Sequence, residues 1–250
     1  MKIQLMSDIH YPFSHRDLPK LSDEADLLVI AGDIHHKVEE CYRCFDKILE
    51  CSSIPVVFVL GNHDYYTREF DSTPDDFKKF FSNFPNIHFL EKDSFEFGGY
   101  TFLGTTLWSD ISNHSARSVI KNGITDYHAI KKIQNGKIFG IDPVDTHLEH
   151  LIAKEFLNSH IKEGEKTIVI THHLPSFECV AHKFLGSSFN AAFASPTLDT
   201  FELNPKLWLF GHTHNFVDKM IGNTRCVCNP YGYPGECYLE YRKEFIIEVE

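Results

Sequence analysis

The chain has 250 residues, of which 42% are hydrophobic and 24% are charged, and its formal net charge is −11. That length and apolar content are enough to bury the core of one folded domain, so we expect a single domain over residues 1–250. The acidic excess argues against DNA or RNA as a partner, because affinity for nucleic acids comes mainly from lysine and arginine side chains that neutralise phosphates.

Two further features bear on the compartment. The first residues, MKIQLMSDIH, lack the apolar core of a secretory signal, and no apolar run approaches the ~18 residues of a membrane span. The seven cysteines are odd in number and lack the paired spacing of zinc knuckles. We therefore expect a soluble cytoplasmic protein with free thiols and no membrane partner.

Three short apolar segments near the start of the chain predict buried strands. They are KIQLMS at 2–7, DLLVIAGD at 26–33 and PVVFVLGN at 55–62, and each ends in polar residues. Between the second and third, KVEECYRCFDKILEC at 37–51 carries apolar residues at helical spacing. This order predicts a strand–helix–strand unit with a crossover helix.

The second half of the chain repeats this pattern. The segment 142–161 predicts a long helix, with Asp142 as N-cap, Pro143 at the first helical position, and Val144, Leu148, Leu151 and Ile152 on one face. Histidines within it, including His150, are expected to face solvent. KTIVITHH at 166–173 and KLWLFGHTH at 206–214 predict strands that end in histidines, and FVDKMI, TRCVCN, CYLEYR and EFIIEVE predict antiparallel strands. The expected fold class is mixed α/β.

Carboxylate, amide and imidazole side chains follow five of these strands. In α/β sheets, ligands bind at the carboxyl ends of the strands, so we expect these side chains to converge on one crevice. A buried cluster of carboxylates and imidazoles without lysine or arginine is destabilising unless a cation neutralises it. Oxygen and nitrogen donors without thiolates suit zinc, manganese or iron. The residues are Asp8, His10, Asp33, Asn62, His63, His172, His173, His212 and His214.

The succession DIH, GD, GNHD, THH and GHTH, in that order, resembles the calcineurin-like metallophosphoesterases over residues 3 to about 215. The resemblance implies a four-layer α-β-β-α sandwich of two mixed sheets flanked by helices. It also implies two divalent transition-metal ions, Mn, Fe or Zn, in a dinuclear centre with Asp33 shared between them. One ion would be held by Asp8, His10, Asp33 and His214, and the other by Asp33, Asn62, His172 and His212.

The resemblance implies hydrolysis of phosphoric esters, with a metal-bound hydroxide attacking phosphorus. Two divalent ions and the Asp8 and Asp33 carboxylates leave a charge of about +2, which attracts an anionic phosphoryl group. Within GNHD, His63 would assist the leaving group and Asp64 would hold the His63 ring in one orientation. The alternative for this stretch is that Asn-His-Asp only caps a turn.

The type of ester stays open between a phosphomonoester and a phosphodiester, and we expect a small phosphorylated or nucleotide-like substrate. Some relatives of this fold are scaffolds that no longer catalyse. The alternative function is therefore a non-catalytic metal-binding scaffold or protein-interaction module.

Residues 105–140 form a possible cap insert. The segment holds five basic and two acidic residues, a local charge of +3 in an acidic chain. We expect Arg117 to meet substrate phosphate and Trp108 to offer a stacking face, with His173 as a further substrate contact. The alternative is a solvated surface loop. NPYGYPGE at 229–236 either rims the site or only links two strands.

Overall fold

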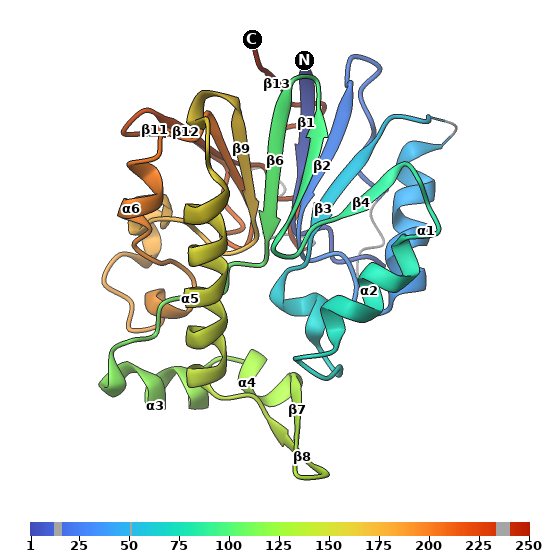
Figure 1. Cartoon of the computed structure of the whole chain (residues 1–250). Coiled ribbons are helices and arrows are strands. Elements are labelled where there is room, and N and C mark those ends of the chain that lie inside the picture. The colour runs from blue at the N-terminus through green and yellow to red at the C-terminus, as the bar shows by residue number, and fades with distance from the viewer. Residues whose placement is uncertain (13–16, 51, 234–240) are drawn as a thin grey trace.

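Two large β-sheets pack face to face with helices on their outer sides in the computed structural model, which describes residues 1–12, 17–50, 52–233 and 241–250 (Figure 1). The first sheet contains β1 (Lys2–Met6), β2 (Leu27–Ala31), β3 (Val56–Val59), β4 (Ile87–Phe89) and β13 (Ile246–Glu248), in the order β13-β1-β2-β3-β4. The second sheet contains β5 (Asp93–Phe97), β6 (Tyr100–Thr105), β9 (Thr167–Thr171), β10 (Leu207–Phe210), β11 (Val217–Ile221) and β12 (Thr224–Cys228), in the order β11-β12-β10-β9-β6-β5. The expected four-layer α/β architecture is confirmed.

The first sheet is built on the predicted strand–helix–strand unit. β1, β2, β3 and β4 run parallel, and α1 (Val38–Leu49) crosses from β2 to β3. Every residue of β2 and β3 is buried, because the sheet is covered on both faces. Strands buried in this way read as continuous apolar runs instead of alternating patterns, which explains why short runs such as VVFVL could be assigned from the sequence.

The second sheet has a parallel centre and antiparallel edges. β6, β9, β10 and β12 run parallel, with β5 antiparallel to β6 and β11 antiparallel to β12. The predicted antiparallel arrangement therefore holds for β11 and β12, whereas β12 also pairs in parallel with β10. β13 pairs antiparallel with β1 in the other sheet. The strand expected in CYLEYR covers 237–242, and residues 237–240 lie outside the described part of the chain.

Three apolar layers hold the sandwich together. The inner layer lies between the sheets and is made of alternate strand residues, such as Leu5, Val29 and Val57 from one sheet and Ile170 and Leu209 from the other. α1 and α2 (Thr73–Phe81) cover the outer face of the first sheet. α5 (Pro143–His160) and α6 (Leu198–Phe201) cover the outer face of the second (Figure 1). Short 3₁₀ turns span Asn62–Tyr65, Gly164–Lys166, Phe177–Cys179, His182–Phe184 and Asn190–Ala192.

α5 begins as predicted but turns a different face to the sheet. The Asp142 carboxylate accepts a hydrogen bond from the Val144 N–H at 3.0 Å, and Pro143 is the first helical residue. The apolar face predicted from the sequence is exposed: the exposed fraction is 52% for Leu148 and 55% for Ile152. The contacts with the sheet come instead from the opposite face, which includes Thr146, His150, Ala153 and Leu157.

The expectation that His150 faces solvent is therefore wrong. The side chain is 1% exposed, and Nδ1 lies 3.1 Å from the Leu107 carbonyl oxygen. A buried imidazole is tolerated when a partner satisfies its polar atoms, and the Leu107 carbonyl fills that role.

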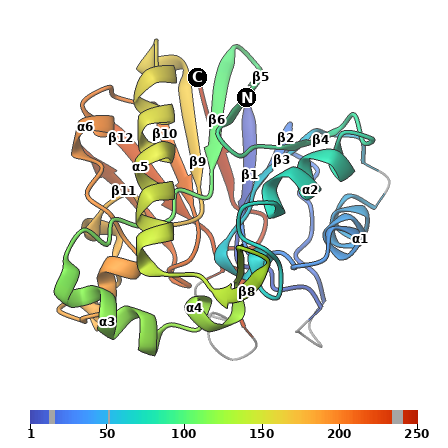
Figure 2. The same ribbon diagram turned by 60° about the horizontal axis from the view of Figure 1, so that its bottom comes forward.

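The insert at 105–140 lies at the end of the sheets where the parallel strands finish (Figures 1 and 2). It contains α3 (His114–Gly123), α4 (Asp126–Ala129) and a hairpin of β7 (Lys131–Gln134) and β8 (Lys137–Gly140). Along the described residues, no helix combines the length and apolar content that a membrane crossing requires.

Candidate metal centre

The loops that follow five parallel strands meet at one edge of the sandwich. Asp8 and His10 follow β1, Asp33 follows β2, Asn62 and His63 follow β3, His172 follows β9, and His212 and His214 follow β10. Backbone hydrogen bonds tie the loops together: the Asp8 N–H donates to the Gly32 carbonyl at 3.0 Å, and the Gly211 N–H donates to the His172 carbonyl at 3.0 Å. The predicted convergence of these residues is therefore present in the fold.

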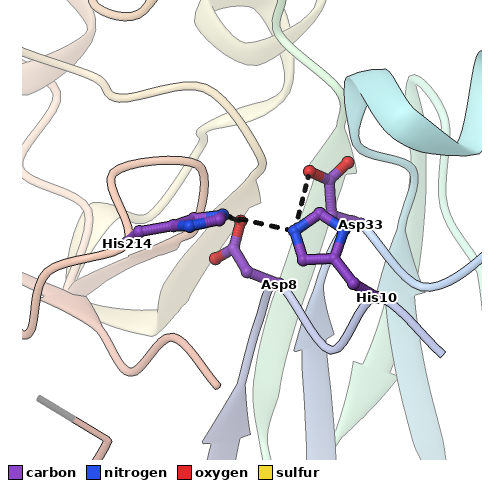
Figure 3. A group of neighbouring side chains, drawn as sticks. All are labelled: Asp8, His10, Asp33 and His214. Carbon is purple, nitrogen blue, oxygen red and sulfur yellow. Dashed lines mark hydrogen bonds and ion pairs between the residues drawn. The ribbon is translucent and has the colours of Figure 1, made fainter. Parts of the chain in front are cut away.

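The first group of candidate ligands contains Asp8, His10, Asp33 and His214, with one donor atom from each lying within 4.8 Å of the others. His10 Nε2 is 3.2 Å from His214 Nε2 and 3.7 Å from Asp33 Oδ2 (Figure 3). His214 Nε2 is 3.4 Å from Asp8 Oδ1. All four side chains therefore point toward one common position.

The second group contains Asp33, His172 and His212, again with donor atoms within 4.8 Å of one another. His172 Nε2 lies 3.5 Å from Asp33 Oδ1 and 3.0 Å from Asn62 Oδ1. Its Nδ1 faces the Ala31 carbonyl at 2.8 Å, an arrangement that places the ring proton on Nδ1 and leaves Nε2 to bind a cation. Asp33 belongs to both groups, as the resemblance implies.

The backbone at these positions is strained. Asp8, His10, Asp33, His212 and His214 have positive φ angles of 53°, 47°, 57°, 67° and 50°. Such left-handed conformations are uncommon for residues other than glycine, and they gather at sites where function requires a particular side-chain direction. Five candidate ligands with this conformation indicate that the loops are shaped to aim donor atoms at the two positions.

Two glycines make room for the donors. A Cβ at Gly61 would lie 2.2 Å from Asp33 Oδ1, and a Cβ at Gly32, whose φ is +84°, would lie 2.4 Å from His172 Nδ1. Both distances are too short for any side chain. The Gly in GD and in GNHD is therefore required by the close approach of Asp33 and His172.

The carboxyls of the cluster are held in their ionised form. Asp8 and Asp33 are buried, and burial alone would favour the neutral acid. Neighbouring imidazoles outweigh burial, His214 for Asp8 and His172 for Asp33, and keep both pKa values below the usual range. Burial likewise disfavours charge on His172, but the Asp33 and Asp8 carboxylates raise its pKa to about 9.

Two other histidines are held neutral. Burial lowers the pKa of His10 to about 4 and keeps the pKa of His212 well below its usual value. A neutral imidazole has a lone pair for a metal, and an ionised carboxylate is the anionic ligand that a divalent ion prefers. The donor set fits two divalent cations, because each group brings carboxylate oxygens and imidazole nitrogens within 4.8 Å of one another around one position. At His172, a cation on Nε2 would take the place of the proton that the Asp33 and Asp8 carboxylates favour.

His63 lies at the rim of the first group. Its ring centroid is 4.8 Å from that of His10, and the ring stacks on Tyr66 at 4.2 Å. The Tyr233 hydroxyl is 3.4 Å from His63 Nδ1, and the Tyr233 ring stacks on His10 at 4.2 Å. The His63 ring is thus held by two tyrosines. Of the segment NPYGYPGE, Tyr233 lies at the rim of the site, and residues 234–236 lie outside the described part of the chain.

Asp64 does not have the predicted role. Its carboxylate accepts hydrogen bonds from the backbone N–H groups of Gly61 at 2.7 Å, Ile34 at 2.8 Å and Asp33 at 3.0 Å. Burial, with the Asp33 carboxylate nearby, raises the pKa of Asp64 to about 7. With its oxygens turned to these N–H groups, Asp64 fastens the loop after β2 to the loop after β3 instead of orienting the His63 ring.

Asp126, from the insert, is a site residue that the sequence did not indicate. Its Oδ1 accepts hydrogen bonds from Asn62 Nδ2 at 2.8 Å and from the Tyr66 hydroxyl at 2.7 Å. The amide of Asn62 is thereby turned so that Oδ1 faces His172. In the sequence, Asp126 is one of two acidic residues of the segment 105–140, and no motif there reveals this contact.

A cavity of about 350 Å³ opens over the two groups, and we call it the metal-site cavity. Its wall includes Asp33, Asn62, His63, His212 and His214. The insert contributes Gly123, Ile124, Thr125 and Asp126, so it does reach the site. Among the described lining residues, Lys183 carries the positive charge, a position that the sequence analysis did not single out.

The three expected substrate contacts are not placed as predicted. Trp108 is 2% exposed and packs against Tyr65 and Phe70, so it offers no stacking face. Arg117 lies outside the lining of the metal-site cavity and donates through Nε to the Ile111 carbonyl at 2.8 Å. Trp108, although within residues 105–140, is part of the hydrophobic core and not of an exposed cap surface.

His173 is also buried, at 1% exposed, behind the candidate ligands. Its Nδ1 lies 3.3 Å from the Thr106 carbonyl, and its ring is 4.5 Å from that of His212. Burial lowers the pKa of His173 to about 3. The side chain therefore packs against a candidate ligand and does not line the metal-site cavity among the described residues.

Comparisons with known proteins bear on the family and the fold. The model of the calcineurin-like phosphoesterase family matches residues 1–216. The uncharacterized protein L509 of Acanthamoeba polyphaga mimivirus is 29% identical over 234 residues, which cover 88% of this chain and 83% of that protein. The crystal structure of a phosphopantetheinyl hydrolase from Mycobacterium tuberculosis is similar with a TM-score of 0.70 at 14% identity, covering 98% of this chain and 94% of that one. At that identity the similarity speaks for the fold alone.

Proposed function

The chain belongs to the calcineurin-like phosphoesterase family, and from this we propose that it is a hydrolase of phosphoric esters that works with two divalent metal ions. The observation that carries the proposal is the pair of donor groups that share Asp33. Asp8, His10, Asp33 and His214 would hold one ion, and Asp33, Asn62, His172 and His212 the other. Two such ions activate water, orient the phosphoryl group and offset its negative charge.

The protein's own residues would divide the remaining work. His63, held between Tyr66 and Tyr233 at the rim of the first group, is positioned to pass a proton to the departing ester oxygen. Asp126 keeps the Asn62 carbonyl oxygen turned toward the second group. Lys183, which lines the metal-site cavity, supplies a positive charge for the non-reacting phosphoryl oxygens.

The metal, the type of ester and the compartment are part of the same proposal. Mn, Fe and Zn all suit the donor set, and monoesters and diesters both remain substrates to test. The proposed compartment is the cytoplasm. Supporting it, within the described residues, are Cys41, Cys44, Cys179 and Cys226, all buried and outside any disulfide.

Metal analysis and kinetics test the proposal together. Protein purified without chelator should contain close to two transition-metal ions per chain and hydrolyse p-nitrophenyl phosphate or bis-p-nitrophenyl phosphate with manganese. His63→Ala should lower kcat/KM by about 10²–10⁴-fold with metal content unchanged, because it removes a proton donor and no ligand. His212→Ala should lower both activity and metal content.

The matched control is His128→Ala, which alters an exposed histidine of the insert and should change neither quantity. Absence of bound metal, together with no metal-stimulated hydrolysis of either ester, would favour the alternative function, a non-catalytic scaffold. Full activity in His63→Ala would remove His63 from the mechanism.

A further inference from the structure

A second cavity, of about 190 Å³, lies beside the metal-site cavity, and we call it the apolar cavity. Most of its wall is made of apolar side chains. They are Ile124, Leu174, Val180, Phe184, Phe189 and Phe193. Of these only Leu174 is fully buried, and Phe184 is 48% exposed, so the cavity has an open apolar wall instead of being a closed packing defect.

The two cavities adjoin each other. Ile124, Phe184 and Phe193 line both, as do the candidate ligand His212 and its neighbour Thr213. The Phe193 ring stacks on the His212 ring with centroids 4.5 Å apart and an interplanar angle of 23°. An apolar surface therefore begins directly at the edge of the second group of candidate ligands.

The charges are divided between the two cavities. Asp33, Asp126 and Lys183 line the metal-site cavity. The Lys183 ammonium lies 5.0 Å from the centre of the ring of Phe184, a residue that lines both cavities. None of the described residues lining the apolar cavity is a lysine, arginine, aspartate or glutamate. A ligand that suits both cavities has an anionic head and an apolar body, because small-molecule sites match apolar walls to apolar groups and place few polar groups at the end to be recognised.

We propose that the apolar cavity binds the organic substituent of the substrate, so that the preferred substrates are phosphoric esters of apolar alcohols; this rests on the phosphoesterase function proposed above. Hydrolysis of such an ester breaks one P–O bond. Water provides the hydroxyl group that joins phosphorus and the proton that leaves with the alcohol. The apolar substituent remains against Phe184 and Phe193 during this step.

The test is a series of n-alkyl ligands of increasing length. Non-hydrolysable n-alkylphosphonates, from methyl to hexyl, are titrated into the metal-loaded protein by calorimetry, and n-alkyl phosphates of the same lengths are assayed for hydrolysis. We expect Kd to fall about fourfold for each methylene that enters the cavity, and kcat/KM to rise with a similar slope. The heat-capacity change of binding should become more negative along the series.

Two variants test whether the dependence of Kd on chain length arises in the apolar cavity. Phe184→Ser should flatten the dependence of Kd on chain length to less than about twofold per methylene, since it removes an apolar wall. Phe177→Ser is the matched control: Phe177 is 43% exposed on the same stretch of chain but does not line the cavity, so the wild-type slope should persist.

The outcomes separate this inference from the function it rests on. A Kd that does not depend on chain length, or no phosphonate binding at all, would overturn the inference. An unchanged slope in Phe184→Ser would overturn the assignment to this cavity. A clear slope for phosphonates without hydrolysis of any ester would keep the apolar subsite and refute the catalytic function.

Discussion

Replacing Asp64 with Asn should weaken the fold and the metal centre together. The Asp64 carboxylate accepts hydrogen bonds from three buried backbone N–H groups, two at Oδ2 and one at Oδ1. Asn keeps one acceptor oxygen and turns an NH₂ group toward the remaining N–H. A buried N–H without an acceptor lowers the free energy of unfolding by about 1–3 kcal/mol. Asp64→Ala leaves all three N–H groups without an acceptor and should therefore lower it by about 3–9 kcal/mol.

The loss should extend to metal content. The N–H groups that Asp64 holds belong to Asp33, shared by both donor groups, to Ile34 next to it in the loop after β2, and to Gly61 in the loop after β3. Loosening them moves ligand atoms whose directions depend on a strained backbone. The neutral amide also relieves the repulsion between the carboxylates of Asp64 and Asp33. Unfolding is therefore measured with manganese in excess, where bound cations reduce that repulsion, and metal content is measured on protein as purified.

The assay is denaturant unfolding, with the free energy of unfolding taken from the midpoint at constant slope, and metal content measured by mass spectrometry. Asp46→Asn, at an exposed position of α1, is the control and should stay within about 0.5 kcal/mol of wild type. If Asp64→Asn kept wild-type stability and full metal content while kcat/KM fell, Asp64 would act on His63 as the sequence suggested. The role derived from its three N–H partners would then be wrong.

Three other predictions address the site and the core. Gly61→Ala should reduce bound metal below two ions per chain in elemental analysis, because its Cβ would lie 2.2 Å from Asp33 Oδ1; full occupancy would contradict the close approach. Chelation should lower the melting temperature, since it leaves two buried carboxylates without cations, and saturating manganese at about 100 times Kd should restore about 2.7 kcal/mol; an unchanged melting temperature with EDTA would count against bound ions. The buried His150 should make stability depend on pH: burial lowers its pKa to about 4, so the unfolded chain takes up a proton below about pH 6.5 before the folded protein does, and stability falls as the pH falls. Between pH 7.5 and 5, the contribution of His150 lowers the free energy of unfolding by about 2 kcal/mol. In denaturant titrations, His150→Gln should lose this contribution, and His160→Gln, at an exposed position, should keep it. Equal pH dependence in both variants would show that His150 protonates freely in the folded state.

The candidate ligands could be predicted because parallel strands bury both faces and end at a common edge. Runs such as VVFVLGN therefore predict both the strand and the position of the polar residue that follows it. Segments without that signature were not assigned. β4 has three residues, and β5 alternates between intermediate and exposed positions at the sheet edge, so neither carries a strong apolar pattern.

Sequence periodicity also gives the faces of a helix without saying which one meets the sheet. In α5 the apolar stripe through Leu148 and Ile152 is exposed, while His150 and Ala153 are buried. Likewise, adjacency in the chain suggested that Asp64 serves His63, whereas its partners come from the backbone of its own turn and of a loop about thirty residues away. Tertiary contacts decided these cases, and a local pattern contains no information about them.

The left-handed backbone at five candidate ligands has a consequence for protein design. In that conformation the Cα–Cβ bond points in a direction that an extended strand end does not offer. Copying the seven side chains onto regular strand ends of another scaffold would therefore aim their donor atoms away from a common point. A transfer of this centre to another protein should therefore include the complete loops, with their glycines and with Asp64, which holds two of the loops together.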